Sequence, residues 1–578
     1  MGVLRLFRYL LTSFGSQFYR SLHPSSPAFR VDMLLIDLNA IFHPAAREIY
    51  FPPVKDLLRA ARQLNQPPPT DEQLERQAFD NILKYIEAII QVCPPKRVLY
   101  LAIDGVAGMC KQSQQRKRRY KAAKERQEQL ANADPAYLAS ISNGSTKEPF
   151  NMANITAGTP WMARLCAHIA QWIQTRKTSV INGVNLSQVR VIYNDMYVPG
   201  EGEHKLIRYL SKECHPRASY CVYSPDADLI MLCMCLSNGR GYILRENIYD
   251  DVQGKWILVD CTKLKSIVCT QLSESESDGA IECDHQQRLV SDYVLFLMLI
   301  GNDFLPNLYC LEIGNQGIET LQTCYAYLRS MNLFLVNSVF SLEQQAFVVL
   351  FEQLASYEPG LILSKRHRRV KFPDSLLATH LLLKTIVKNE GAPEECKIQV
   401  EELDFASLRQ EYYRRKFASE FTDWSEDAFE ANVTEIVKHF IRGLNFVMTY
   451  YAIRIPSFAW CYEHHYAPLM ADIHQVATRL NSLEWAALQS FEYKDALTLN
   501  QALLGIIPPS SRSVCSASVM QILEKHAQHE LFSEQFEVDL EGKQQDYEGI
   551  CLLPNVPYTS LKKLCKEKSN HSYDPAVF

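Results

Sequence analysis

The stretch RVLYLAID, residues 97–104, is a short apolar run that ends on an acid and decides the fold. Three other segments have the same design. They are VDMLLID (residues 31–37), VRVIYND (189–195) and SYCVYSPDAD (219–228), and stretches with helical periodicity separate them. Runs of this length, rich in β-branched and aromatic residues, are typical of buried strands in a parallel sheet. We therefore predict an α/β fold, a twisted and mostly parallel sheet with flanking helices.

The length and composition are those of a globular protein. The chain has 578 residues, of which 47% are hydrophobic, and a formal net charge of -5. This is enough apolar material for a large buried core. The charge shows none of the overall basicity of a histone-like protein, so any polyanionic partner must be held by a local basic patch.

The cysteines and apolar stretches bear on the compartment. None of the 17 cysteines forms a C-x-x-C pair, and the closest doublet, Cys233 and Cys235, lies in an apolar run typical of buried packing. We therefore expect a reducing compartment and predict cytoplasmic localisation, with a nuclear one as the alternative. Apolar runs such as residues 293–301 are much shorter than the roughly 20 residues that cross a bilayer, so we predict a soluble protein without a membrane partner.

The N-terminal 30 residues allow two interpretations. They contain several arginines and no acidic residue before Asp32, which is typical of a mitochondrial transit peptide. The alternative is that they belong to the folded protein.

The pattern changes along the chain. Residues 270–287 are polar and acidic, which predicts an exposed loop. Beyond about Gly317 the periodicity becomes mostly helical, as in residues 435–455, without a comparable series of strands. We predict an α/β core over residues 1–316 and a helix-rich second region, packing on it, over residues 317–578.

Acidic residues gather at the carboxyl ends of the predicted strands, the edge at which open α/β sheets bind ligands. In an extended segment, Asp226 and Asp228 would project to the same side. Taken alone, the pair Glu201 and Glu203 favours capping of the helix that follows. We interpret Asp292 as a helix-start residue instead. The seven carboxylates expected at this edge are Asp37, Asp104, Glu201, Glu203, Asp226, Asp228 and Asp303.

A cluster of seven carboxylates requires protons or cations. Two unit charges about 4 Å apart repel by about 4 kcal/mol at an effective dielectric constant near 20. Oxygen ligands suit hard divalent ions, and two ions that share carboxylates suit in-line attack on a phosphodiester. We predict that all seven acids are catalytic and bind two Mg²⁺ or Mn²⁺ ions.

A basic segment follows Asp104 closely. Lys111, Gln115, Arg118 and Arg119 recur at spacings of four, three and one, so they share roughly one face of a helix. Basic runs are often solvated helix faces or nuclear-localisation signals, which is the alternative here. Because the segment begins beside an expected metal ligand, we favour a pocket in which these four residues bind a terminal phosphate.

These motifs resemble the Xrn family of 5′→3′ exoribonucleases, relatives of the flap endonucleases with a PIN-like fold. The resemblance spans nearly the whole chain, with the motifs in family order. They include LLIDLNAIFH (34–43), AIDGVAGMCKQSQQRKRRYKAA (102–123), VPGEGEHKLIRYL (198–210), PDADLIMLCM (225–234), LIGNDFLPNL (299–308), GLNFVMTYYAIRIPSFAWCYEHHYAPLMADI (443–473) and DLEGKQQDYEGICLLPNV (539–556). The resemblance implies that the seven acids ligate two metals and that the basic face holds a 5′-monophosphate. It also implies a folded N-terminus that packs near the active site, in place of a transit peptide.

The resemblance further implies a translocation device, in which His43 and an aromatic ring of the second region stack on the first bases. Stacking is sequence-tolerant and contributes about 1–3 kcal/mol per base. The family's S-W-x-W pattern begins here at Ser457, with Phe458 in place of one tryptophan and Trp460 as the other. Both rings are candidates, and simple core packing is the alternative for Trp460, as it is for Tyr462 and Tyr466. Other departures are Leu4 and Ala157, where the family has proline, and Tyr547, where it has tryptophan.

The implied function is processive 5′→3′ degradation of 5′-monophosphorylated single-stranded RNA to 5′-mononucleotides by two-metal-ion hydrolysis. The alternatives are a flap-type, structure-specific DNA nuclease and a non-catalytic RNA-binding scaffold. The chain resembles a short family member that ends after the catalytic core. We expect a monomer, with decapping or other RNA-decay factors as partners.

Overall fold

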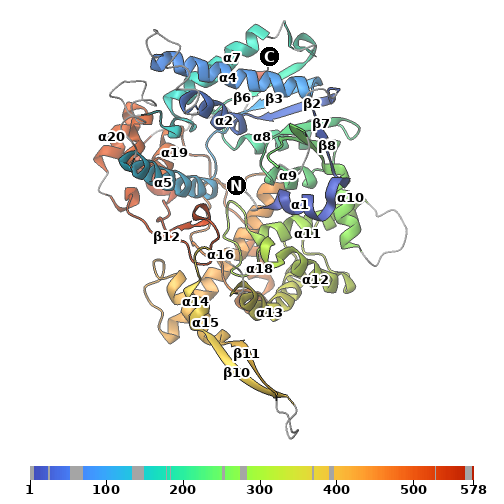
Figure 1. The fold of residues 1–578 in the computed structure, drawn as a ribbon, viewed down its shortest axis with the longest axis vertical. Coiled ribbons are helices and arrows are strands. Elements are labelled where there is room, and N and C mark those ends of the chain that lie inside the picture. Colours follow the sequence, from blue (N-terminus) through green and yellow to red (C-terminus); the bar gives the residue numbers. More distant parts are fainter. Residues whose placement is uncertain are drawn as a thin grey trace.

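The computed structural model describes residues 5–23, 27–52, 69–132, 149–176, 179–181, 184–249, 254–273, 283–366, 370–388, 396–526, 529–566 and 576–577. An eight-stranded sheet of order β1-β9-β8-β7-β2-β3-β6-β14 lies at one end of the molecule (Figure 1). Its strands are β1 (Tyr19–Leu22), β2 (Val31–Asp37), β3 (Pro95–Ala102), β6 (Arg190–Asn194), β7 (Ser219–Tyr223), β8 (Arg240–Glu246), β9 (Trp256–Asp260) and β14 (Ala576–Val577).

The central strand pairings are parallel, which confirms the predicted fold class. β2 pairs with β3 and β7, β3 with β6, and β7 with β8, all in parallel. The pairings of β9 with β8, of β1 with β9 and of β14 with β6 are antiparallel. The four segments predicted as strands are β2, β3, β6 and β7. Their carboxyl ends therefore meet at one edge of the sheet.

Both faces of the sheet are buried, which explains why its strands are continuous apolar runs. Along β2, Met33 and Leu35 belong to one hydrophobic cluster, whereas Leu34 and Ile36 belong to another. The helices that pack on the second face are α2 (Asn39–Tyr50), α4 (Asp71–Val92) and α7 (Pro160–Arg176). Those on the first face are α1 (Leu6–Phe14), α8 (Gly202–Glu213), α9 (Asp228–Cys235), α10 (Cys261–Leu272) and α11 (Cys283–Ile300).

Helix α1 bears on the two interpretations of the N-terminus. Its Leu6, Phe7, Leu10 and Phe14 are all buried in the main hydrophobic cluster. Residues 6–14 are therefore part of the folded core. Leu4 lies outside the described residues.

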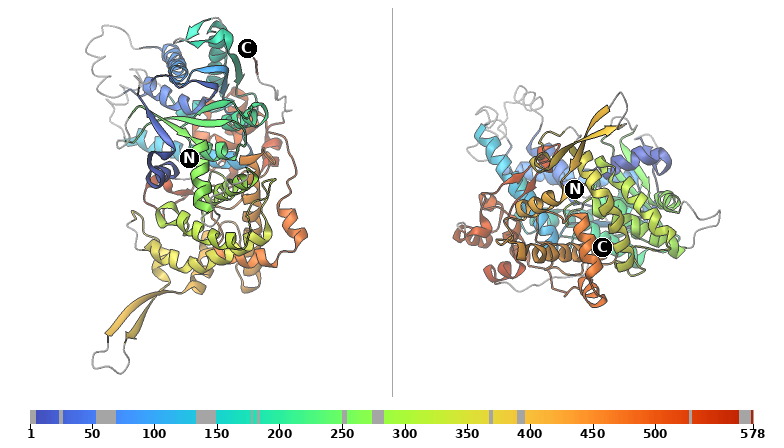
Figure 2. Two further views of the ribbon diagram at one scale, coloured as in Figure 1. Left: turned by 90° about the vertical axis from the view of Figure 1, so that its right-hand side faces the viewer. Right: turned by 90° about the horizontal axis from the view of Figure 1, so that it is seen from below.

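The second half of the chain is mostly helical. Its helices are α12 (Gly317–Ser330), α13 (Gln344–Arg366), α14 (Ser375–Thr379), α15 (Phe405–Lys416), α16 (Glu426–Ala452), α17 (Met470–Arg479), α18 (Ser482–Leu488), α19 (Leu499–Ile506), α20 (Ala517–Lys525) and α21 (Tyr558–Leu564). An antiparallel hairpin of β10 (Leu381–Lys388) and β11 (Cys396–Leu403), which the sequence analysis did not expect, projects from this half (Figure 2). The division of the chain at residue 316 stays a prediction.

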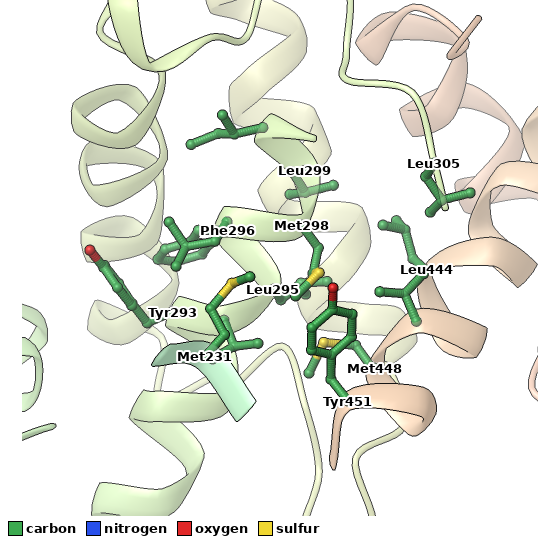
Figure 3. Packing of buried hydrophobic residues seen from close by; sticks show 14 of the residues in the cluster. Met231, Tyr293, Leu295, Phe296, Met298, Leu299, Leu305, Leu444, Met448 and Tyr451 are labelled. Carbon is green, nitrogen blue, oxygen red and sulfur yellow. The ribbon is translucent and has the colours of Figure 1, made fainter. Parts of the chain in front are cut away.

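The two halves share one core. Leu295, Met298 and Leu299 of α11 lie opposite Leu444 and Met448 of α16 (Figure 3). Helix α9, which follows the sheet strand β7, belongs to the same cluster. The position of α16 relative to the sheet edge is therefore fixed by apolar packing.

Helix α13 is the one described helix that is long and apolar enough, by length and composition, to cross a membrane, over Gln344–Lys365. Phe347 on this helix is fully buried in the main cluster. Glu358, also buried, accepts the backbone N–H groups of Met470 and Ala471 at 2.8 and 2.9 Å. These contacts are those of a core helix.

Two local predictions are wrong, and a third is wrong at its two ends. Asp292 does not start a helix but lies inside α11, fully buried. Residues 270–272 and 283–287 of the predicted loop are helical, and the part between them, 274–282, lies outside the described residues. Asp226 and Asp228 do not share an extended strand, because β7 ends at Tyr223 and Asp228 is the first residue of α9.

Candidate active site

The seven predicted carboxylates come together at the carboxyl edge of the sheet. Asp37 ends β2, Asp104 follows β3, and Asp303 follows α11. Six of them line a cavity of about 280 Å³, and these are Asp37, Asp104, Glu201, Glu203, Asp226 and Asp303. Lys111, Gln115, Arg118 and Arg119 of helix α5 (Met109–Asn132) line the same cavity, as does His43. One cavity therefore has an acidic wall and a basic wall.

Glu201 occupies the N-cap position of α8 but does not act as a cap. Its backbone has the extended conformation of an N-cap residue, while its side chain accepts no cap hydrogen bond. The helix receives its acceptor from the segment after β3, because Asp104 Oδ1 accepts the N–H of Gly202 at 2.7 Å. The carboxylate of Glu201 is thus available to other groups, which overturns the capping interpretation for this residue.

Glycines on both sides of Glu201 suit the backbone conformation and the close packing of this segment. A Cβ at Gly202 would lie 3.0 Å from Asp37 Oδ1 and 3.4 Å from Asp104 Oδ1. Gly200, with φ of +100°, adopts a backbone conformation that other residues rarely enter. The P-G-E-G-E sequence therefore allows a helix start to approach two aspartates closely.

Burial and mutual repulsion act on the acids together. Burial, and then the charges of Asp104 and Asp226, raise the pKa of Asp37 well above its usual range. Burial, followed by the charge of Glu201, does the same to the pKa of Glu203. Desolvation and like charges both disfavour the ionised form, so the site gains from any bound cation.

Lys111 offsets part of this charge. Its ammonium lies 2.7 Å from Glu201 Oε2 and 2.8 Å from Asp303 Oδ2, and all three side chains are at most 14% exposed. Burial acts to raise the pKa of both acids, but the Lys111 ammonium outweighs it, so the pKa of each carboxyl falls below its usual range. The basic helix and the acidic edge are joined at this residue.

Asp228 is 3% exposed and is the one predicted acid that is not among the described residues lining the cavity. Burial, and then the charge of Asp303, raise its pKa to about 6. Its Oδ2 accepts the hydroxyl of Tyr451 at 2.7 Å, while Oδ1 is buried and has no hydrogen-bond partner among the described residues. An unpaired buried carboxylate oxygen beside other acids is the donor that a cation site requires.

The donor set fits a divalent metal ion. Ligand atoms of Glu201, Glu203 and His204 all lie within 4.8 Å of one another. The other predicted ligands offer oxygen donors, which hard divalent ions prefer. The site is therefore an acidic cluster suited to metal binding.

Two neighbours of the glutamates have supporting roles. The His204 ring lies between Glu201 and Glu203, with Nδ1 at 3.7 and 3.8 Å from them, and packs against Tyr450. The buried Lys205 donates to the backbone oxygen of Ile103 at 2.6 Å. Lys205 thereby anchors the segment that carries Asp104.

The basic wall combines one fixed guanidinium with one exposed guanidinium. Arg119 donates through Nε and Nη2 to Thr156 Oγ1 at 3.1 and 3.0 Å, and burial lowers its pKa to about 9. Arg118 is exposed. Arg116, by contrast, is buried and donates to Tyr120 and the carbonyl of Gly505, so it supports the helix from behind.

Sequence reasoning missed two residues that touch the acids. Tyr450 donates its hydroxyl to Glu201 Oε1, and Tyr451 donates to Asp228 Oδ2. Both come from α16, far along the chain. A pair of tyrosines in an apolar helix is typical of core packing, so the pattern alone gave no reason to select them.

Comparison with protein families covers both halves of the chain. Residues 1–247 match the model described as XRN 5'-3' exonuclease N-terminus. Residues 284–394 and 375–572 match the Xrn1 helical domain. The chain belongs to the XRN family.

Relatives within the XRN family are similar over nearly all of this chain. It is 24% identical to 5'-3' exoribonuclease 1 of Homo sapiens, over 99% of this chain and 34% of that protein. It is 23% identical to 5'-3' exoribonuclease 2 of Candida albicans, over 98% of this chain and 72% of that protein. It is 24% identical to 5'-3' exoribonuclease 1 of Saccharomyces cerevisiae, over 99% of this chain and 44% of that protein. The chain thus spans less than half the length of two of these relatives.

The aromatic residues at the motif positions, Phe458 and Trp460, pack against neighbouring side chains of the core. Phe458 is 7% exposed and packs with Val106 and Met109. Trp460 stacks on Phe446 with ring centroids 4.3 Å apart. Neither ring is among the described residues that line the cavity with His43. Both are held in the core by neighbouring apolar side chains, and their role in base stacking stays a prediction.

Two residues that depart from the XRN family pattern, Ala157 and Tyr547, line cavities. Ala157 lies in the wall of the active-site cavity, next to Thr156. Tyr547, 55% exposed, lines a neighbouring cavity that also contains Asp303. Neither substitution removes a carboxylate.

Proposed function

We propose that the chain is a processive 5′→3′ exoribonuclease that degrades 5′-monophosphorylated single-stranded RNA and releases 5′-mononucleotides. The observation that carries this proposal is the single cavity with six carboxylates on one wall and four phosphate-binding candidates on the other. Membership of the XRN family supports the same class of reaction.

The proposed cofactors are two Mg²⁺ or Mn²⁺ ions. The residues that would hold them are Asp37, Asp104, Glu201, Glu203, Asp226, Asp228 and Asp303. When bound, such ions activate water for attack and neutralise charge on the leaving oxygen. The unpaired Oδ1 of Asp228 and the raised pKa of Asp37 support this assignment.

The basic wall would select and position the RNA end. Arg119, fixed by Thr156, and the exposed Arg118 would hold a terminal phosphate with charge-assisted hydrogen bonds, together with Gln115. Lys111 lies between this wall and the acids, so it would reach both the terminal phosphate and the reacting region. A fixed end sets which phosphodiester meets the acids, which converts binding into orientation for the reaction.

Other parts of the proposal rest on the sequence. We propose that His43, which lines the cavity, stacks on a base near the 5′ end. Cytoplasmic localisation, a monomeric state and association with decapping factors stay predictions.

The reaction can be tested directly with the purified chain. With Mg²⁺, a 5′-monophosphorylated RNA labelled at its 3′ end should disappear, and 5′-mononucleotides should accumulate. Because the proposed degradation is processive, no ladder of shortened labelled RNAs should appear. A 5′-flap DNA should remain uncut. Cleavage of the flap DNA with the RNA left intact would replace the proposed function with that of a structure-specific DNA nuclease.

A further inference from the structure

Two consecutive tyrosines at the end of α16 contact the acidic cluster from the helix-rich half of the chain. The Tyr450 hydroxyl donates to Glu201 Oε1, and the Tyr451 hydroxyl donates to Asp228 Oδ2 at 2.7 Å. The two rings are 1% and 2% exposed. The carboxylates they contact start two different helices, α8 and α9, at the sheet edge.

Aromatic and apolar packing holds both phenols in place. The ring of Phe304 lies 4.7 Å from that of Tyr450 and 6.0 Å from that of Tyr451, measured between centroids. The ring of His204 lies 3.9 Å from Tyr450. Tyr451 lies in the core between α11 and α16, close to Met448 (Figure 3). Neither hydroxyl can move away without disturbing this core.

Each phenol engages one oxygen of its carboxylate, so the second oxygen remains for other partners in the cluster. Glu201 Oε2 is on the side of Lys111, and Asp228 Oδ1 has no hydrogen-bond partner among the described residues. A hydrogen bond to one oxygen fixes the side-chain rotamer and stabilises the charged form. Partners of this kind orient metal ligands and raise their affinity.

We propose that Tyr450 and Tyr451 are positioning residues for the metal ions, so that helix α16 sets the cation affinity of the sheet-edge cluster. The inference rests on the proposed metal site but not on the RNA that is cleaved. A purely packing role for the two rings predicts instead that removal of the hydroxyl groups leaves the cation affinity unchanged.

The test compares Mn²⁺ binding by full-length variants in the absence of RNA. Tyr450→Phe and Tyr451→Phe keep the ring and remove one hydroxyl each. Mn²⁺ titrations followed by electron paramagnetic resonance should give affinities about 10- to 100-fold weaker than wild type. The matched control is Tyr412→Phe, in α15, where a fully buried tyrosine donates to the carbonyl of Ala467 at 2.7 Å, and its Mn²⁺ affinity should equal that of wild type.

The outcomes separate this inference from the proposed function. Unchanged Mn²⁺ affinity in both tyrosine variants overturns it, and so does an equal loss in Tyr412→Phe, which would indicate a general effect on folding. A thermal unfolding midpoint near that of wild type, together with weaker Mn²⁺ binding, supports it. If the wild-type chain binds Mn²⁺ but spares RNA, the proposed function fails while the inference still stands.

Discussion

The ammonium of Lys111 lies 2.7 Å from Glu201 Oε2, so the helix that carries the phosphate-binding candidates is tied directly to the acidic cluster. Burial acts to lower the pKa of Lys111, but Glu201 and Asp303 outweigh it and raise the pKa well above its usual value. The lysine is therefore charged throughout the physiological range. The Lys111 ammonium therefore lies where the acidic and basic walls of the cavity meet.

Replacement of Lys111 by an uncharged residue should weaken catalysis. We expect Lys111→Met to lower kcat/KM on 5′-monophosphorylated RNA by about 10- to 100-fold, because hydrogen bonds to charged groups contribute about 1.5–3 kcal/mol. Lys121→Met is the control, since Lys121 of the same helix donates to the backbone carbonyl of Asp546 and does not line the cavity. Equal losses in the two variants would contradict a specific role for Lys111.

Metal binding should stabilise the fold. A ligand that binds only the native state at 100 times its Kd adds about 2.7 kcal/mol to the free energy of unfolding. We therefore expect Mn²⁺ to raise the thermal unfolding midpoint of the wild type, and a chelator to reverse the increase. Asp37→Asn should remove most of this response. A midpoint that does not depend on Mn²⁺ would argue against the metal site.

The close approach at Gly202 gives a geometric prediction. In Gly202→Ala the new methyl group would lie 3.0 Å from Asp37 Oδ1 and displace that carboxylate. The carboxylate would have to shift by a few tenths of an ångström. Because a misplacement of about 1 Å can lower activity about 100-fold, we expect this smaller shift to lower the rate in RNA hydrolysis assays by up to about tenfold. Gly360→Ala is the control, because no described residue lies within 4 Å of a Cβ at that position. Full activity of Gly202→Ala would contradict the close packing described here.

Asp292 predicts a pH dependence of stability that is separate from the active site. It accepts hydrogen bonds from Tyr325 at 2.6 Å and from the backbone N–H groups of Leu335 and Val336 at 3.1 and 2.8 Å, while burial raises its pKa to about 7. Because the folded state holds this proton more tightly, the stabilisation is present below about pH 4, the unfolded pKa, and is lost as the pH rises through about 7.

The measurement for Asp292 is denaturant unfolding of the wild type and Asp292→Asn at pH 5 and pH 8. The variant should be less stable by about 1–3 kcal/mol at pH 5, because it cannot satisfy the same donors. Its deficit should shrink at pH 8. Unfolding free energies that change in parallel between the two pH values would show that Asp292 does not titrate as described.

Much of the sheet and its acidic edge could be predicted from local patterns. Parallel strands buried on both faces are apolar runs, and the acids that follow them, such as Asp37 and Asp104, must meet at one edge. The start of α9 at Asp228 was missed because Asp226 and Asp228 alternate with a small residue, Ala227. In the sequence, this alternation cannot be distinguished from the end of a strand. Asp292 was misplaced because its partners, 33 to 44 residues away in sequence, decide its position in the core.

Contacts between the two halves were not predictable. Tyr450 lies 249 residues from Glu201 in the chain, and its hydroxyl contact depends on how α16 packs on α11. Periodicity identifies the buried face of such a helix but not which polar atom at its end meets which carboxylate. The same limit applies to Trp460, because the motif did not predict that its ring stacks on Phe446.

The most direct test of the account is the 5′-end preference. With Mg²⁺, the wild-type chain should degrade 5′-monophosphorylated RNA and spare the same RNA with a 5′-hydroxyl or a 5′-triphosphate, because the basic wall and the acids share one cavity. Arg118→Met removes the exposed guanidinium of the basic wall. This variant should have a lower rate on the monophosphate substrate and unchanged rates on the other two. Equal wild-type rates on all three ends would contradict the assignment of Lys111, Gln115, Arg118 and Arg119 as the pocket for the terminal phosphate.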